Sequence, residues 1–179
     1  FMPEFGVKIL PRSTTWVSRI DSYFLNNSAE IMDKDYQQTQ SLVAIQNGSL
    51  FGVGPGKSTQ RSILPYSESD FIFAIILEEY GFFGGTIALL FYLILFFRAI
   101  KISFKTDSIF GGLIVVGLMF SLVFQALINM LVSVEIIPVT GQTLPLISMG
   151  GTSLVFTFIS LGIILSVSRN SLNGVYEKA

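Results

Sequence analysis

The sequence predicts an all-α, polytopic membrane protein, and three observations lead to this prediction. Hydrophobic residues make up 51% of the 179 positions and charged residues only 13%, about half the charged share of soluble domains. Three apolar segments follow one another in the second part of the chain, with the length that helices need to cross a bilayer. Basic residues gather in some of the connections between them and are absent from another.

The residue types that are absent narrow the chemistry. The chain has no His and no Cys, which excludes disulfides and thiolate metal sites and removes the commonest metal ligand. Acid–base work therefore falls to Asp, Glu, Lys or Tyr. The net charge of -1 gives no indication of nucleic-acid binding. The chain starts at Phe1 with no signal-peptide pattern, and we expect it to be a piece of a longer protein.

Residues 1–70 are predicted to form an extracytoplasmic region of mixed composition. Short helices are expected at residues 18–25 and 36–46, and residues 1–10 are either the tail of a preceding span or a surface segment. The Gly-rich stretch at residues 47–57 is expected to be a loop.

That loop ends like a phosphate-binding loop, in Gly56-Lys57-Ser58. The pattern requires a Gly where this chain has Phe51, and it also requires a preceding strand. Nucleotide binding is therefore excluded. A Gly-rich loop that carries Lys57 and Arg61 can still contact an anionic headgroup.

The remainder of the chain is predicted to alternate spans and connections. The first span is about 40 Å long as a helix, and the third is short unless it extends back to residue 151. The expected boundaries are a span at 71–97, a cytoplasmic loop at 98–109, a span at 110–134, a re-entrant loop at 135–150, a span at 151–168 and a cytoplasmic tail at 169–179.

The loop at residues 135–150 is apolar enough for membrane depth, but Pro and Gly break it too often for a helix. Non-helical backbone is tolerated at that depth only where protein buries it or where it lines a cavity. We therefore expect a re-entrant or cavity-lining loop that offers close backbone approach and unpaired carbonyls and amides. A packed structural kink is the alternative.

Basic residues predict the orientation. Arg98, Lys101 and Lys105 flank the first connection, and Arg169 follows the third span, whereas the 135–149 loop has no Lys or Arg. The positive-inside rule then places residues 98–109 and the C-terminus in the cytoplasm. The long N-terminal region and its boundary with the first span then lie on the opposite, extracytoplasmic side.

Asp70 stands at that boundary, where a polar segment turns into an apolar one. A carboxylate at a membrane surface is a functional candidate by position. One interpretation is a helix cap, with Ser69 or Asp70 stabilising the first turn of the span. The other is a general base that faces the outer leaflet.

Three more polar side chains lie inside the predicted spans. Glu78 lies about 80° around the helix from Asp70, closer than Glu79, and either joins its site or pairs with another span. Gln125 and Asn129 are one helical turn apart on one face. They either hold helices together or line a substrate groove.

Several motifs in order resemble the SEDS (shape, elongation, division and sporulation) family of membrane proteins, over about residues 12–169. They are Tyr36–Leu42, Gly52–Ser58, Leu64-Pro65, Asp70–Ala74, Glu78–Gly81, Gln125–Asn129 and Pro138–Ser153. The stretch Thr143–Ser148 is closer to the division members than to the elongation members. Tyr66, Glu68 and Met149 depart from the Glu, His and Tyr that are frequent there.

The resemblance implies the C-terminal part of a fold of about ten helices: a large external loop and the last three spans. It implies a peptidoglycan glycosyltransferase of the bacterial inner membrane that polymerises lipid II into undecaprenyl-linked glycan during cell division. Asp70 would be the catalytic base. The resemblance further implies that the pyrophosphate charge is offset by Lys57 and Arg61 or by a divalent cation such as Mg or Mn. The residues implied to shape the substrate groove are Glu78, Gln125, Asn129, Thr143, Ser148 and Ser153.

The implied partners are a class B penicillin-binding protein transpeptidase and other divisome proteins. Three alternatives stay open. Broken membrane segments and buried polar residues also suit a transporter that flips lipid II. A scaffold that only recruits the transpeptidase is another, and an elongation polymerase of the same family is the third.

Overall fold

The computed structural model describes residues 31–63, 69–106 and 108–177. Within these ranges the chain is helical and has no strand. The elements are α2 (Ile31–Gly48), the 3-10 turn η1 (Gln60–Ser62), α3 (Ile72–Lys105), α4 (Ile109–Ser133) and α5 (Gly151–Glu177). The helix predicted at residues 18–25, the segment at 1–10, and Tyr66 and Glu68 lie outside the described residues.

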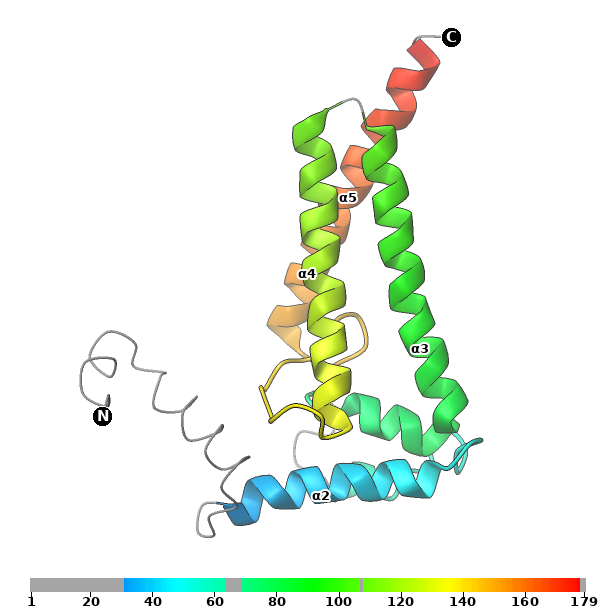
Figure 1. Cartoon of the computed structure of the whole chain (residues 1–179), viewed down its shortest axis with the longest axis vertical. Helices are drawn as coiled ribbons and strands as arrows, with labels where there is room; N and C mark the ends of the chain where they lie inside the picture. The colour runs from blue at the N-terminus through cyan, green and yellow to red at the C-terminus, as the bar shows by residue number, and fades with distance from the viewer. Residues whose placement is uncertain (1–30, 64–68, 107, 178–179) are drawn as a thin grey trace, which may run out of the picture.

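Three of these helices are long and apolar enough to cross a membrane: Ile72–Lys105, Ile109–Ser133 and the Gly151–Arg169 part of α5. Figure 1 shows them running lengthwise, with α2 lying across their lower end. Many of their large apolar side chains are exposed, as expected for helices that face lipid.

Helix α3 is broken at Gly81, whose backbone (φ 67°, ψ −167°) is not helical. The residues before the break lie across the lower end of the molecule, beside α2, and those after it rise alongside α4 (Figure 1). The predicted span at 71–97 therefore differs from the structure at both ends. The lengthwise part begins at Phe82 and continues to Lys105, so most of the loop predicted at 98–109 is helical.

The loop after α2 occupies the break. Val53 N and Gly54 N donate to the carbonyls of Glu78 and Glu79, each at 3.0 Å. In return, Phe82 N donates to Ser49 O at 3.1 Å. A helix break leaves amides and carbonyls without intrahelical partners, and this loop supplies them.

Glycine is required where these two segments meet. A Cβ on Gly81 would lie 2.4 Å from Leu50 O, and a Cβ on Gly52 would lie 2.2 Å from Glu79 O. Both residues also have positive φ values, of 67° and 80°, which glycine adopts at no steric cost. The Gly-rich loop, which resembled a phosphate-binding loop in sequence, therefore serves to pack backbone against backbone.

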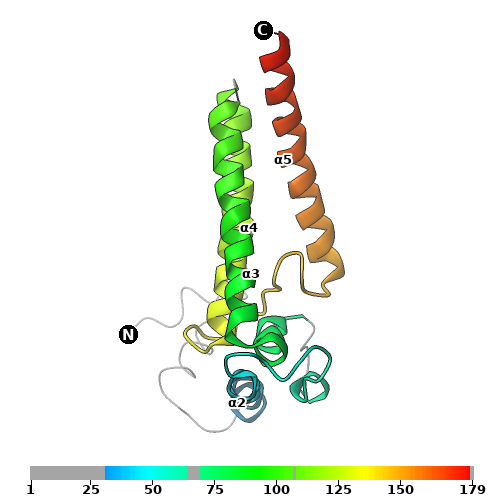
Figure 2. The ribbon, with the colours of Figure 1, turned by 90° about the vertical axis from the view of Figure 1, so that its right-hand side faces the viewer.

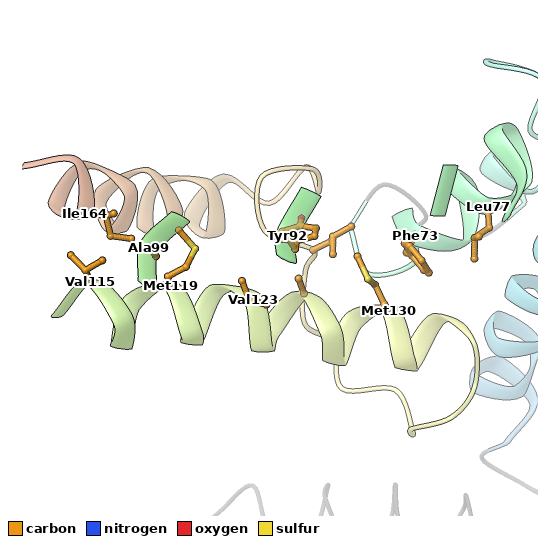
Figure 3. Close-up of a cluster of buried hydrophobic side chains, with 11 residues drawn as sticks. Phe73, Leu77, Tyr92, Ala99, Val115, Met119, Val123, Met130 and Ile164 are labelled. Carbon is orange, nitrogen blue, oxygen red and sulfur yellow. The ribbon is translucent and has the colours of Figure 1, made fainter. Parts of the chain in front are cut away.

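The apolar core lies mainly between α3 and α4. Figure 3 shows Phe73, Tyr92 and Ala99 of α3 facing Val115 and other side chains of α4. Among the described residues, the buried members of this core that come from outside these two helices are Ile164 of α5 and Leu144 of the preceding loop. Helices α3 and α4 thus form the scaffold against which the loop and α5 are placed.

Candidate active site

Asp70 lies immediately before α3, with its side chain partly buried. Its Oδ1 accepts a hydrogen bond from Ser69 Oγ at 2.8 Å. A Cβ on Gly141 would lie 3.8 Å from Asp70 Oδ2, so the loop between α4 and α5, which was predicted to be re-entrant, passes beside the carboxylate. The N-cap residue of α3 is Phe71, and no side chain makes a capping hydrogen bond there. The helix-cap interpretation of Asp70 is therefore wrong.

Asn129 of α4 fixes the backbone next to that carboxylate. Its Nδ2 donates to Asp70 O at 2.8 Å and to Gln142 O at 2.7 Å. The side chain is only 1% exposed. One buried amide therefore joins the start of α3 to the re-entrant loop, which are far apart in the sequence.

Gln125 holds the next residue of the same loop. Its Nε2 donates to Thr143 O at 3.0 Å, one helical turn before Asn129. The polar pair on α4 therefore binds two consecutive loop carbonyls, those of Gln142 and Thr143. The two side chains therefore hold a loop, whereas one of the two interpretations had them holding helices together.

Ser148 closes the loop on the other side of Asp70. Its Oγ donates to Ser69 O at 2.6 Å and accepts from Leu144 N at 2.7 Å. Thr143 Oγ1 in turn donates to Ser153 Oγ at 2.8 Å, at the start of α5. The backbone carbonyls of Ser69 and Asp70 are thus each held by a buried side chain from outside α3.

Tyr92 is a site residue that the sequence did not suggest. Its hydroxyl donates to Pro145 O, about 15 Å along the helix axis from Phe82. The loop therefore climbs between the helices before it turns back into α5, as Figure 2 shows. The available signal was a phenol within an apolar span, because a buried Tyr hydroxyl usually finds a partner.

Glu78 belongs to a different cluster from Asp70. It is 1% exposed and accepts hydrogen bonds from Ser58 Oγ, from Thr59 N at 3.2 Å and from Thr59 Oγ1 at 3.0 Å. The structure therefore assigns its carboxylate to anchoring the turn before η1. It was expected at the substrate, but its oxygens already face these donors.

Lys57 and Arg61 flank that anchored turn, and both are exposed. Glu78 fixes the backbone between them, so the positions of both basic residues depend on it. The structure thus separates the candidates into two groups: the Asp70 network, with Gln125, Asn129, Thr143, Ser148 and Ser153, and the Glu78 anchor with its two neighbouring cations.

The described residues do not form an all-protein cage for a divalent cation. Over residues 31–63, 69–106 and 108–177, no three acidic side chains gather into a group that could hold a metal. Mg²⁺ usually keeps several waters and binds through one or two carboxylates together with substrate phosphates, and in the described part of the chain Asp70 supplies one carboxylate to this site. Glu78 is enclosed by N–H and O–H donors, which repel a cation. No catalytic step is therefore assigned to a protein-held metal.

The geometry suits a proton acceptor at Asp70. A carboxylate has room for about four hydrogen bonds, and in the described part of the chain this one accepts a single bond, from Ser69. Its backbone is fixed, and the residue as a whole is half-buried. A base held in this way can meet a hydroxyl that approaches from the lower end of the helices.

Comparisons with known proteins agree on one family. A family model described as "Cell cycle protein", of the FtsW, RodA and SpoVE type, matches residues 8–173. The chain is 42% identical over 156 residues to the stage V sporulation protein E of Bacillus subtilis, covering 87% of this chain and 42% of that protein. It is 39% identical over 158 residues to a probable peptidoglycan glycosyltransferase FtsW of Hydrogenovibrio crunogenus, covering 86% of this chain and 41% of that protein.

A solved structure on the coordination of polymerization and crosslinking by a peptidoglycan synthase complex is also similar. The TM-score is 0.66 at 26% sequence identity, and the match covers 93% of this chain and 47% of that chain. The chain thus spans about two fifths of the length of the two curated relatives and about half of the solved chain.

Proposed function

Because this chain belongs to the FtsW/RodA/SpoVE family of membrane proteins, we propose that a full-length protein carrying it polymerises peptidoglycan strands from lipid II. The curated relative named FtsW is described as a probable peptidoglycan glycosyltransferase. The observation that carries the proposal is the bridge by Asn129, which fixes Asp70 against the Gln142 carbonyl of the re-entrant loop.

The proposed reaction is a displacement at an anomeric carbon. A sugar 4-hydroxyl attacks this carbon, a new C–O bond forms, and the bond to the lipid pyrophosphate breaks. Asp70 takes the proton of the attacking hydroxyl. The pyrophosphate leaves with the bonding electrons, and its charge is offset by Lys57 and Arg61 at the exposed loop.

The loop residues have supporting roles in this proposal. Ser148 is 3% exposed and is engaged by two backbone groups, so it shapes the groove rather than touching the substrate. Thr143 and Ser153 bind each other across the entrance to α5. Together they hold the loop that would form one wall beside Asp70.

The reaction would take place on the extracytoplasmic side. Arg98, Lys101 and Lys105 belong to the C-terminal part of α3, and Figure 1 shows this end of α3 at the top, where it meets α4. Asp70 and the loop lie at the other end. The positive-inside rule makes the upper end cytoplasmic, so Asp70 faces the leaflet from which flipped lipid II would be drawn.

The proposed partner is a class B penicillin-binding protein, together with other division proteins. The support is the similar solved structure, which concerns a synthase complex in which polymerization and crosslinking are coordinated. A polymerase and a transpeptidase in one assembly would crosslink each strand as it is made.

The test is Asp70→Asn in the full-length protein, assayed with its penicillin-binding protein for glycan formation from lipid II. Removing the base while keeping the side-chain size should abolish polymerisation. The matched control is Glu79→Gln, which removes a carboxylate on the neighbouring helix that has no part in the proposed site. Its activity should stay close to that of the wild type.

Three outcomes separate the competing functions. Full activity of Asp70→Asn would sink the catalytic role. Loss of lipid II transfer across liposomes, with polymerisation retained, would favour a transporter. Equal retention of both activities in the variant, with loss of transpeptidase recruitment, would favour a scaffold.

A further inference from the structure

The loop after α2 exposes apolar side chains that the proposed function does not use. Phe51 is 81% exposed, and its ring centroid lies 5.5 Å from that of Phe83. Leu50 and Phe82 beside them are 60% and 61% exposed. These four residues, Leu50, Phe51, Phe82 and Phe83, are called the Phe51 patch below.

The patch lies at the depth where the hydrocarbon core of the membrane should begin. The distance along α3 from Phe82 to Lys101 is about 29 Å, close to the hydrocarbon thickness of about 30 Å. With Lys101 at the cytoplasmic surface, Phe82 and Phe83 stand at the outer boundary. Phe51, in contact with Phe83, stands there too.

The loop also has the backbone that such a depth demands. Apolar surroundings penalise every unpaired amide and carbonyl. Ser49 O and Leu50 O accept from Phe82 N and Phe83 N, at 3.1 and 3.5 Å, and Gly52 N donates to Gly48 O at 2.7 Å. The loop therefore exposes its apolar side chains, while much of its backbone is hydrogen-bonded within the protein.

The apolar surface continues from the patch along one side of α3. Phe83, Ile87, Leu90 and Ile94 are spaced three or four residues apart and therefore share a face. All four are exposed. In Figures 1 and 2 the loop lies below the foot of this part of α3, on the side away from α4.

We propose that the Phe51 patch is a membrane-interface anchor, immersed at the boundary between the headgroups and acyl chains of the outer leaflet. Segments that lie in the membrane interface bury Trp, Phe and Leu side chains at this boundary. Lys57, exposed on the same loop, would then lie near lipid phosphates. The loop is thereby held at the membrane surface, and with it the turn that Glu78 anchors.

The test places a fluorescent probe at the tip in the full-length protein. Phe51→Trp is reconstituted in bilayers of phosphatidylglycerol and phosphatidylethanolamine that carry bromine near the headgroup end of the acyl chains, and the wild-type signal is subtracted. We expect strong quenching by the brominated lipid and weak quenching by acrylamide from water. The matched control is Asn47→Trp, an exposed polar position on the last turn of α2, where the opposite pattern is expected.

Each other outcome would overturn the anchor. Quenching of Trp at position 51 by acrylamide alone would place the patch in water. Quenching by neither agent would show that protein covers it, from elsewhere in the chain or from a partner. Equal lipid quenching at both positions would remove the special role of the patch.

A second measurement uses the unmodified protein, so the result does not depend on the stability of a variant. A photoreactive acyl chain in the same bilayers should label the peptide that contains Phe51. Absence of label there, with labelling of α3 at Ile87 or Ile94, would contradict the anchor. Neither measurement requires glycosyltransferase activity, so a failure here leaves the proposed function standing.

Discussion

Asn129 shows how a single side chain organises this site. Its side-chain amide donates its two N–H groups to backbone carbonyls of two separate segments, Asp70 O and Gln142 O. A buried carbonyl that loses its donor costs about 1–3 kcal/mol. The position of the Asp70 backbone is therefore set mainly from α4 rather than from its own helix.

Asn129→Leu should destabilise the full-length protein by about 1–3 kcal/mol for each carbonyl left unpaired. It should also lower the rate of polymerisation from lipid II, because Asp70 loses its register with the loop. Gln125→Leu is the matched variant, since it removes one bond, to Thr143 O, one turn further from Asp70. Thermal unfolding and turnover at saturating lipid II measure the two effects, and a larger loss of turnover in Gln125→Leu would contradict the assignment.

At the scale of elements, the break in α3 determines where the loop after α2 is held. Gly81 ends one helix and allows the next to start in a new direction. The freed backbone groups pair with the loop after α2, and the same loop carries Phe51 and Lys57. A continuous α3 would remove the partners of that loop and displace the turn that Glu78 holds.

Gly81→Ala should therefore destabilise the fold by about 1–3 kcal/mol, the usual cost of a strained backbone position. The added Cβ would also meet Leu50 O at 2.4 Å and Gly52 N at 2.5 Å. Gly117→Ala on α4 is the control, because no atom lies within 4 Å of the new Cβ, and it should be neutral or stabilising by up to about 1 kcal/mol. Similar thermal unfolding midpoints for the two variants would argue against a structural role for the break.

At the scale of the whole molecule, charge and architecture point the same way. The basic residues of α3 and the Asp70 network occupy opposite ends of the three long helices (Figure 1). The lower end holds α2, the broken part of α3 and the re-entrant loop. The candidate site residues therefore gather at one end of the long helices, and the connection between α3 and α4 lies at the other end.

The orientation can be measured with single cysteines, because this chain contains none. In a full-length protein without other cysteines, Ser62→Cys should react with a membrane-impermeant maleimide in cells whose inner membrane is intact and whose outer layer is permeable to the reagent. Ser108→Cys, between α3 and α4, should react only after the inner membrane is opened. Both positions are exposed, and the reverse labelling pattern would overturn the extracytoplasmic placement of Asp70.

The sequence by itself determined the helical membrane class, the three apolar helices and the broken segment before the last of them. Hydropathy and Pro/Gly content are local properties, so they can be read along the chain. The candidates Asp70, Gln125 and Asn129 were also found from local signals, as polar residues in or beside an apolar segment, whereas Thr143, Ser148 and Ser153 were named through the resemblance to the family.

The tertiary structure alone decided which of these candidates meet. Periodicity placed Glu78 closer to Asp70 than Glu79, but that inference assumed that Asp70 belongs to the helix, which begins at Ile72. It also could not include the donors of Ser58 and Thr59. The break at Gly81 could not be predicted, because a continuous apolar run indicates one span whether or not a glycine changes the direction of the helix. The pairing of Asn129 with both Asp70 and Gln142 depends on contacts between segments distant in sequence, and such contacts exist only once the helices have packed.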